Sequence, residues 1–214
     1  MRILLARHGE TLWNAEGRYQ GQADIPLSAL GETQARALGQ RLADVRIDRA
    51  VASPLGRARR TAELALGEAR APMLGLDAGL QEIAHGEWEG LLASEIHARD
   101  PALMRAWREA PHTVQMPGGE SLRDVAERVW PAFARACAGL AADETVLIVA
   151  HDAVNRALLC RILGMPMSHF WRFRQAPTTL NLLEGAAVDH LDVVRLNDSN
   201  HHTALFGEAV HRAL

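Results

Sequence analysis

The chain of 214 residues is long enough for one substantial domain, and its 48% hydrophobic and 23% charged residues are typical of a globular protein rather than a disordered one. A net charge of -3 gives no electrostatic basis for binding nucleic acid or an anionic membrane. No apolar run reaches the roughly 18 residues that span a bilayer, and the first segment lacks the apolar region of a signal peptide, so we expect a cytoplasmic protein.

The first third of the chain alternates short apolar runs with helical periodicity. Residues 2–7 are typical of a strand, and Ser28 is placed to cap a helix that runs to about residue 44. A second strand is expected over residues 48–52, directly before Ser53-Pro54. This Ser-Pro pair predicts the start of a helix that continues to about residue 66.

The segment from residue 72 to residue 119 is less regular, although Asp100-Pro101 is typical of a helix start. Ser121 predicts the N-cap of a helix whose apolar stripe continues to Ala136. Thr145 to Ala150 is the strongest strand pattern in the chain, and its apolar character indicates a central position in a parallel sheet. The remaining expected elements are a helix over 153–163 and strands near 179–183 and 191–196.

This alternation predicts an α/β fold, with a single three-layer domain over residues 1–214 and a mostly parallel central sheet flanked by helices. Residues from about 85 to 120 are expected to form a small helical and loop cap over the active site. Cys137 and Cys160 lack the spacing of a zinc or redox pair and are interpreted as buried thiols. The absence of lysine excludes a P-loop and any Schiff-base mechanism.

Two histidines follow predicted strands, His8 after the first and His151 after the most apolar one. Ligands of open α/β sheets bind at the carboxyl ends of strands, where such residues converge. Arg7 and Arg57 lie near the same edge, and a guanidinium offers the fork of donors that suits phosphate. Helical spacing places Arg57 and Arg60 on a similar side of their helix. The alternative is that these arginines are solvated surface residues without a role in phosphate binding.

Five short segments carry a further pattern, in this order along the chain: Arg7-His8-Gly9-Glu10-Thr11 followed by Asn14, residues 53–62 with Arg57, residues 80–90 with Glu82, residues 117–121, and Val149-Ala150-His151. Together they resemble the histidine phosphatase superfamily, the phosphoglycerate-mutase-like proteins. The sequences after His151 and before the Gly118-Gly119 loop are most similar to the metal-independent phosphoserine phosphatases of that superfamily.

The resemblance implies a phosphatase that acts on a small phosphomonoester through a phosphohistidine on His8, without metal or other cofactor. His8, Arg7, Arg57, Glu82 and His151 are then the catalytic residues. Glu82 protonates the leaving oxygen and afterwards activates water, so we expect burial to raise its pKa. We also expect a backbone carbonyl to hold the other ring nitrogen of His8. The phosphate-binding residues implied are Arg7, Asn14, Gln20, Gly21, Arg57, His151 and His201.

Several alternatives stay open at this stage. A 2,3-bisphosphoglycerate-dependent phosphoglycerate mutase has the same motifs, although the interval between Glu82 and His151 leaves no room for the insertion that mutases carry. A non-catalytic module that binds a phosphorylated ligand is a third reading, and His85-x-Glu87 resembles half of a zinc deaminase site. Asp152 departs from the small residues usual after the second histidine, and we expect it to cap the following helix. A homodimer is one option for the oligomeric state.

Overall fold

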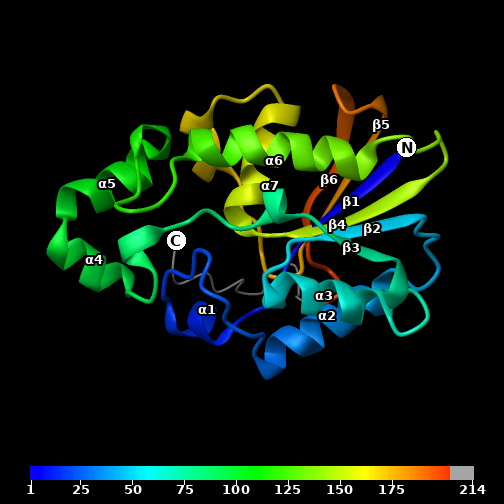
Figure 1. The fold of residues 1–214 in the computed structure, drawn as a ribbon, viewed down its shortest axis with the longest axis horizontal. Coiled ribbons are helices and arrows are strands. Elements are labelled where there is room, and N and C mark those ends of the chain that lie inside the picture. The colour runs from blue at the N-terminus through cyan, green and yellow to red at the C-terminus, as the bar shows by residue number, and fades with distance from the viewer. Residues whose placement is uncertain (203–214) are drawn as a thin grey trace.

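The computed structural model describes residues 1–202, and its centre is a six-stranded sheet in the order β3-β2-β4-β1-β5-β6 (Figure 1). Strands β1, β2, β3 and β4 pair in parallel, whereas β5 and β6 run antiparallel to their neighbours. This is the mostly parallel sheet predicted from the sequence. The strands are β1 Arg2–Arg7, β2 Arg49–Ala52, β3 Leu74–Leu76, β4 Thr145–Ala150, β5 Leu180–Ala187 and β6 His190–Asp198.

Alternate side chains of the central strands enter two separate hydrophobic clusters. Ile3 and Leu5 of β1 belong to the larger cluster, and Leu4 and Ala6 belong to the smaller one. Strand β4 divides in the same way, and all six of its residues are buried. Because successive side chains of a strand point to opposite faces, two clusters require helices on both faces of the sheet.

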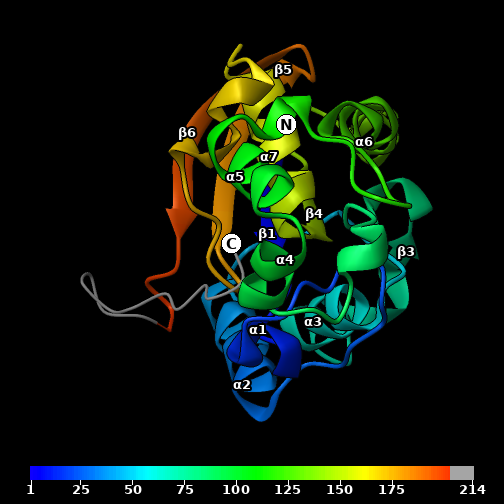
Figure 2. The same cartoon turned by 90° about the vertical axis from the view of Figure 1, so that its left-hand side faces the viewer.

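Four helices provide this cover (Figures 1 and 2). Helices α2 (Ala29–Arg41) and α3 (Gly56–Leu66) pack together on one face, and α6 (Leu122–Cys137) and α7 (Asp152–Ile162) pack together on the other. The predicted N-caps of α2 and α6 are confirmed, because the Ser28 and Ser121 hydroxyls accept hydrogen bonds from backbone N–H groups of the first turn. Helix α3 begins later than predicted, at Gly56, with Leu55 as its N-cap residue.

The segment after β3 extends beyond the carboxyl end of the sheet and contains α4 (Ala93–Arg99) and α5 (Pro101–Glu109) (Figure 1). Asp100 accepts a hydrogen bond from the N–H of Leu103, as expected for the N-cap of α5. Ile96, Met104 and Trp107 of these helices lie in the same hydrophobic cluster as α6 and α7. A short helix, α1 (Leu12–Glu16), follows β1.

The two cysteines are buried and unpaired, as the sequence indicated. Burial raises the pKa of Cys137 to about 12 and that of Cys160 to about 11, which makes the reactive thiolate scarce at neutral pH. Two features of the sheet were not predicted. The three-residue strand β3 was missed, and β5 and β6 are longer than the strands expected near 179–183 and 191–196.

The loop that follows His8 lies against the first turn of α2 at a pair of glycines. A Cβ atom on Gly31 would lie 2.0 Å from the backbone oxygen of Glu10, and one on Gly9 would lie 2.6 Å from the backbone oxygen of Gly31. We predict that Gly31→Ala lowers the free energy of unfolding by about 1–3 kcal/mol, because the loop and the helix must separate. Denaturant unfolding of Gly31→Ala beside Gly75→Ala, where the nearest atom is 3.7 Å away, tests this. Equal stability of the two variants would contradict it.

Candidate active site

The predicted strand ends bring two histidines together at one edge of the sheet. His8 follows β1, His151 follows β4, and the two strands are parallel neighbours. The His8 and His151 rings are 5.1 Å apart between centroids, and both side chains are buried. Burial, followed by the positive charge of Arg57, holds the pKa of His151 well below its usual range, so this ring is neutral. Neither ring nitrogen of His151 has a hydrogen-bond partner among residues 1–202.

The tautomer of His8 follows from the hydrogen bond of its Nδ1 atom. The Nδ1 atom lies 2.7 Å from the carbonyl oxygen of Gly9, so Nδ1 donates the proton and Nε2 carries the lone pair. This confirms the expected contact with a backbone carbonyl. The backbone of His8 is also fixed, because its N–H donates to Ala150 and its carbonyl accepts from Thr178. Such a ring is pre-oriented for attack through Nε2.

Arg57 enters the same region from the first turn of α3. Its guanidinium donates to the carbonyl oxygens of Gly21 and Ala23 at 2.6 and 2.8 Å, which ties α3 to the loop after α1. Burial lowers its pKa to about 10, so the group stays positively charged at neutral pH. Arg60 does not accompany it: the Arg60 side chain is 46% exposed and pairs with Glu32 at 3.1 Å. The expectation that both arginines share a direction was wrong.

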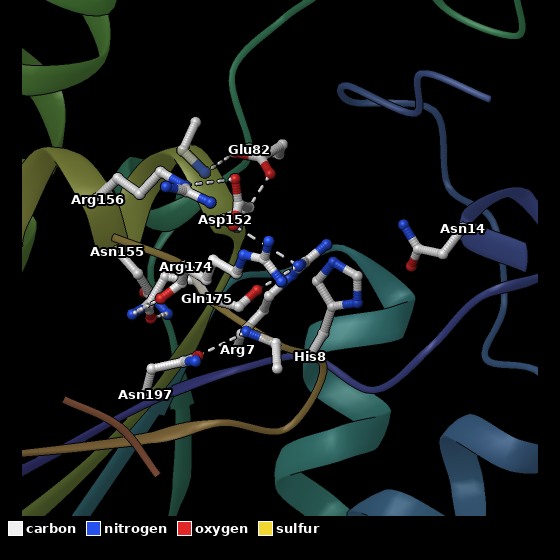
Figure 3. Close-up of polar contacts among 12 residues, drawn as sticks. Arg7, His8, Asn14, Glu82, Asp152, Asn155, Arg156, Arg174, Gln175 and Asn197 are labelled. Atoms are coloured by element: carbon white, nitrogen blue, oxygen red, sulfur yellow. Dashed lines mark hydrogen bonds and ion pairs between the residues drawn. The ribbon is translucent and has the colours of Figure 1, made fainter. Parts of the chain in front are cut away.

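Arg7 is held next to His8 by two acceptors (Figure 3). Its Nη1 atom donates to the carbonyl oxygen of Gln175 at 2.5 Å and lies 3.6 Å from Oδ1 of Asp152. The side chain of Gln175 is in turn bonded to Asn181 and Asn155, so the loop behind Arg7 is anchored to β5 and α7. The Nε atoms of Arg7 and Arg57 are buried without a partner among the described residues.

Two side-chain amides complete the polar lining. The side-chain oxygen of Asn14 accepts a hydrogen bond from the Thr11 N–H at 3.1 Å, and that of Gln20 accepts one from the Thr11 hydroxyl at 2.7 Å. The NH₂ group of each amide is then the part suited to an anion. Gly21 has a φ of +53°, and a Cβ atom there would lie 2.0 Å from Oε1 of Glu89. The positive φ therefore favours glycine in the turn that supports Arg57, and a larger residue there would be strained and would displace the Glu89 carboxylate.

Glu82 reaches the site from the loop between β3 and α4. Its carboxyl oxygens accept hydrogen bonds from the N–H groups of Asp152 and Ala153, at 3.1 and 3.2 Å, and from that of Ile83 at 3.0 Å. Burial, with the charge of Asp152 as the next cause, raises the pKa of Glu82, the direction expected for a general acid. One pocket is lined by Arg7, His8, Asn14, Gln20, Gly21, Arg57 and Glu82.

Comparison with known proteins places this arrangement in a family. A model of the family described as histidine phosphatase superfamily (branch 1) matches residues 3–199. The chain belongs to this superfamily. Phosphoserine phosphatase 1 of Hydrogenobacter thermophilus is 39% identical over 173 residues, which cover 81% of each chain. The probable phosphoglycerate mutase GpmB of Erwinia tasmaniensis is 37% identical over 174 residues, which cover 81% of this chain and 80% of that protein.

A solved structure agrees with the family assignment. The mycobacterial glucosyl-3-phosphoglycerate phosphatase in complex with VO3 has a TM-score of 0.82 and 34% sequence identity, over 92% of this chain and 98% of that one. The predicted α/β architecture and superfamily are thus confirmed, and the chain is a histidine phosphatase superfamily hydrolase.

Asp152 does not cap α7, and this prediction was wrong. The N-cap residue of α7 is His151, whose side chain makes no cap hydrogen bond, and Glu82 accepts from the first N–H groups instead. Asp152 lines the pocket with its carboxylate between Arg7 and Arg156 (Figure 3).

The histidine phosphatase pocket also contains residues that the resemblance did not place there. His85 lies edge-on to Tyr19 and Trp107, and burial lowers its pKa to about 3, so it is neutral. Its position three residues after Glu82, inside the 80–90 segment, was the available signal. The lining residues not selected as site residues are Arg18, Tyr19, His85, Trp107, Asp152, Ala153, Phe170 and Trp171.

His201 is not brought to the pocket. Its ring packs on that of His202, and the nearby charges are those of Asp198 and Arg41. Among residues 1–202, no cluster of three or more His, Cys, Asp or Glu side chains has the arrangement of a metal site. The same part of the chain has no helix long and apolar enough to cross a membrane.

Proposed function

We propose that this protein hydrolyses a small phosphomonoester through a phosphohistidine formed on His8. The observation that carries the proposal is the convergence of a pre-oriented imidazole, two buried guanidinium groups and a buried carboxylic acid on one pocket. The imidazole supplies a nucleophile, the guanidinium groups match the oxygens of phosphate, and the acid supplies a proton. The family assignment supports the same chemistry.

In the first step, the lone pair of His8 Nε2 forms a bond to phosphorus while the bond from phosphorus to the ester oxygen breaks. Glu82 transfers its proton to that oxygen, so an alcohol leaves. Arg7 and Arg57 bind the equatorial oxygens, with Asn14 and Gln20 as further donors and neutral His151 beside them. In the second step, water gives a proton to Glu82 and attacks phosphorus, the P–N bond breaks, and inorganic phosphate leaves.

The lead substrate is phosphoserine, because a phosphoserine phosphatase is 39% identical over most of the chain. Sugar phosphates and phosphorylated sugar acids are the next candidates, in line with the glucosyl-3-phosphoglycerate phosphatase. We further propose that residues 85–120 act as a cap that selects the alcohol part, since His85 and Trp107 of this segment line the pocket.

The test is phosphate release from a panel of phosphomonoesters in the presence of EDTA. We expect turnover without added metal, with phosphoserine among the best substrates. Loss of all activity in EDTA, with recovery on adding back a divalent cation, would contradict a mechanism in which arginines supply the positive charge.

A phosphoglycerate mutase is the second candidate, because GpmB of Erwinia tasmaniensis is 37% identical. It predicts interconversion of 3- and 2-phosphoglycerate after priming with 2,3-bisphosphoglycerate, with little release of phosphate. The same panel, analysed by ³¹P NMR, separates isomerisation from hydrolysis. We expect hydrolysis to dominate.

A further inference from the structure

Asp152 places a negative charge inside a pocket that is proposed to bind a dianion. It is the first residue of α7, it is 4% exposed, and it lines the pocket. A carboxylate there opposes phosphate binding unless its charge is compensated. Its neighbours show how it is compensated and which other groups it affects.

Arg156, one turn further along α7, holds Asp152 in place. Its Nε atom is 2.8 Å from Oδ2 of Asp152, and its Nη1 atom donates to the carbonyl oxygens of Phe170 and Phe173. The guanidinium carbon also lies 4.9 Å from the centre of the Trp171 ring. Arg156 is thus fixed by backbone and aromatic contacts, and Asp152 Oδ1 remains directed to Arg7 at 3.6 Å.

Asp152 is also adjacent to Glu82 across the first turn of α7. Its own N–H donates to Glu82 Oε2, and the N–H of Ala153 donates to Oε1. These donors, at the positive end of a helix, favour the ionised form of Glu82. The negative charge of Asp152 and burial favour the protonated form. Whether Glu82 carries the proton needed by the leaving group therefore depends on the balance between these N–H donors, which favour ionisation, and burial with the charge of Asp152, which favour protonation.

Other charged and titratable groups face Glu82 from each element around it. Arg128 of α6 donates to the Glu82 carbonyl oxygen and pairs with Glu120, so its charge is balanced. The remaining groups are Arg7 and His8 after β1, Arg57 of α3, His85 of the following loop, and His151, Asp152 and Arg156 around the start of α7. Among these, Asp152 carries the one negative charge, and Arg7 and Arg57 carry the positive charges that oppose it.

We propose that Asp152 is a positioning residue that holds the guanidinium of Arg7 in the pocket and keeps the proton on Glu82 between turnovers. The inference rests on the proposed function, because it assigns Asp152 to the acid step of that mechanism. It also explains why a carboxylate is accommodated in the pocket. Arg156 compensates the charge at Oδ2, while Oδ1 faces Arg7 and the negative charge acts on Glu82.

The direct test is the pH dependence of kcat/KM for Asp152→Asn. The amide retains an oxygen for Arg156 but removes the charge, so the proton on Glu82 is lost at lower pH. We expect the basic limb of the profile to move down by about one pH unit, a typical effect of one nearby charge, and kcat/KM above that limb to fall about 10-fold. Loss of the contact between Asp152 Oδ1 and Arg7 lowers kcat/KM at every pH without moving the limb, so the position of the limb is the measurement that decides the effect on Glu82. Asp152→Glu, which restores the charge, is expected to return the limb toward that of the wild type.

Asp48→Asn is the matched control. Asp48 is likewise an ion-paired aspartate, but it is half-buried, and it binds Arg46 and the N–H of Thr145 at the opposite end of the sheet. Its profile should superimpose on that of the wild type. A basic limb in Asp152→Asn that coincides with the wild-type limb would overturn the proposal.

A ¹³C NMR titration of the side-chain carboxyls measures the protonation states of Glu82 and Asp152 in the wild type. This measurement requires neither catalysis nor a folded Asp152→Asn variant. In the wild type at pH 7 we expect a proton on Glu82 and an ionised Asp152. Observation of the proton on Asp152 instead, or of an ionised Glu82, would overturn the inference. If no phosphomonoester is hydrolysed by the wild type, the proposed function fails, and this titration still decides the relation between Asp152 and Glu82.

Discussion

Replacing His8 by alanine will lower kcat for phosphomonoester hydrolysis by about 10⁴-fold or more, the scale on which removal of a covalent nucleophile acts. Arg7 and Arg57 remain in place, so affinity for inorganic phosphate will change by less than about 10-fold. Phosphate release and calorimetric titration measure the two effects. His190→Ala is the control, because His190 is an exposed residue at the start of β6 and its loss should leave both quantities unchanged.

The covalent intermediate provides an independent measurement of the same prediction. Rapid quenching of the wild-type enzyme with ³²P-labelled substrate in base should leave label on the protein, since a phosphohistidine is stable in base and labile in acid. The label should be absent from His8→Ala. Substantial turnover or labelling of His8→Ala would show that another residue is the nucleophile.

The parallel core of the fold could be predicted because its residues are buried on both faces. An uninterrupted apolar run such as that of β4 has few other stable environments, and Ser28 and Ser121 gave local signals for two helix starts. Strand β3 could not be predicted, because three residues including Gly75 carry no periodic pattern. The antiparallel direction of β5 depends on its pairing with β1, which local sequence does not encode.

The site was predictable where position and motif agreed. His8 and His151 follow strands that pair in parallel, so their approach is a consequence of topology. The capping role expected for Asp152 was wrong because local preference and tertiary structure disagree at this position. Its preference for a helix N-cap is a local tendency, whereas the N–H groups of α7 are satisfied by Glu82, which is 70 residues away in the chain. Trp107 reaches the pocket through tertiary packing of the cap segment, which leaves no sequence signal of its own, whereas the position of His85 three residues after Glu82 was a usable signal.

Replacing Glu82 by glutamine will lower kcat by about 10²- to 10⁴-fold on an alkyl phosphomonoester such as phosphoserine, the range typical of a lost general acid. Glutamine keeps one oxygen for the N–H groups of α7 and cannot donate an acidic proton. Since Glu82 must be protonated in the first step, the fall of kcat/KM at high pH should also disappear from the profile of the variant.

The choice of leaving group makes this prediction specific to proton transfer. The p-nitrophenolate ion leaves readily without protonation, so Glu82→Gln should retain far more activity on p-nitrophenyl phosphate than on phosphoserine. Glu127→Gln, an exposed change on α6, should retain wild-type activity on both substrates. An equal loss on the two esters in Glu82→Gln would mean that Glu82 supports the pocket without protonating the leaving group. The ratio of the two losses therefore measures proton donation by Glu82 separately from its second contribution, the fixing of α7 beside His151.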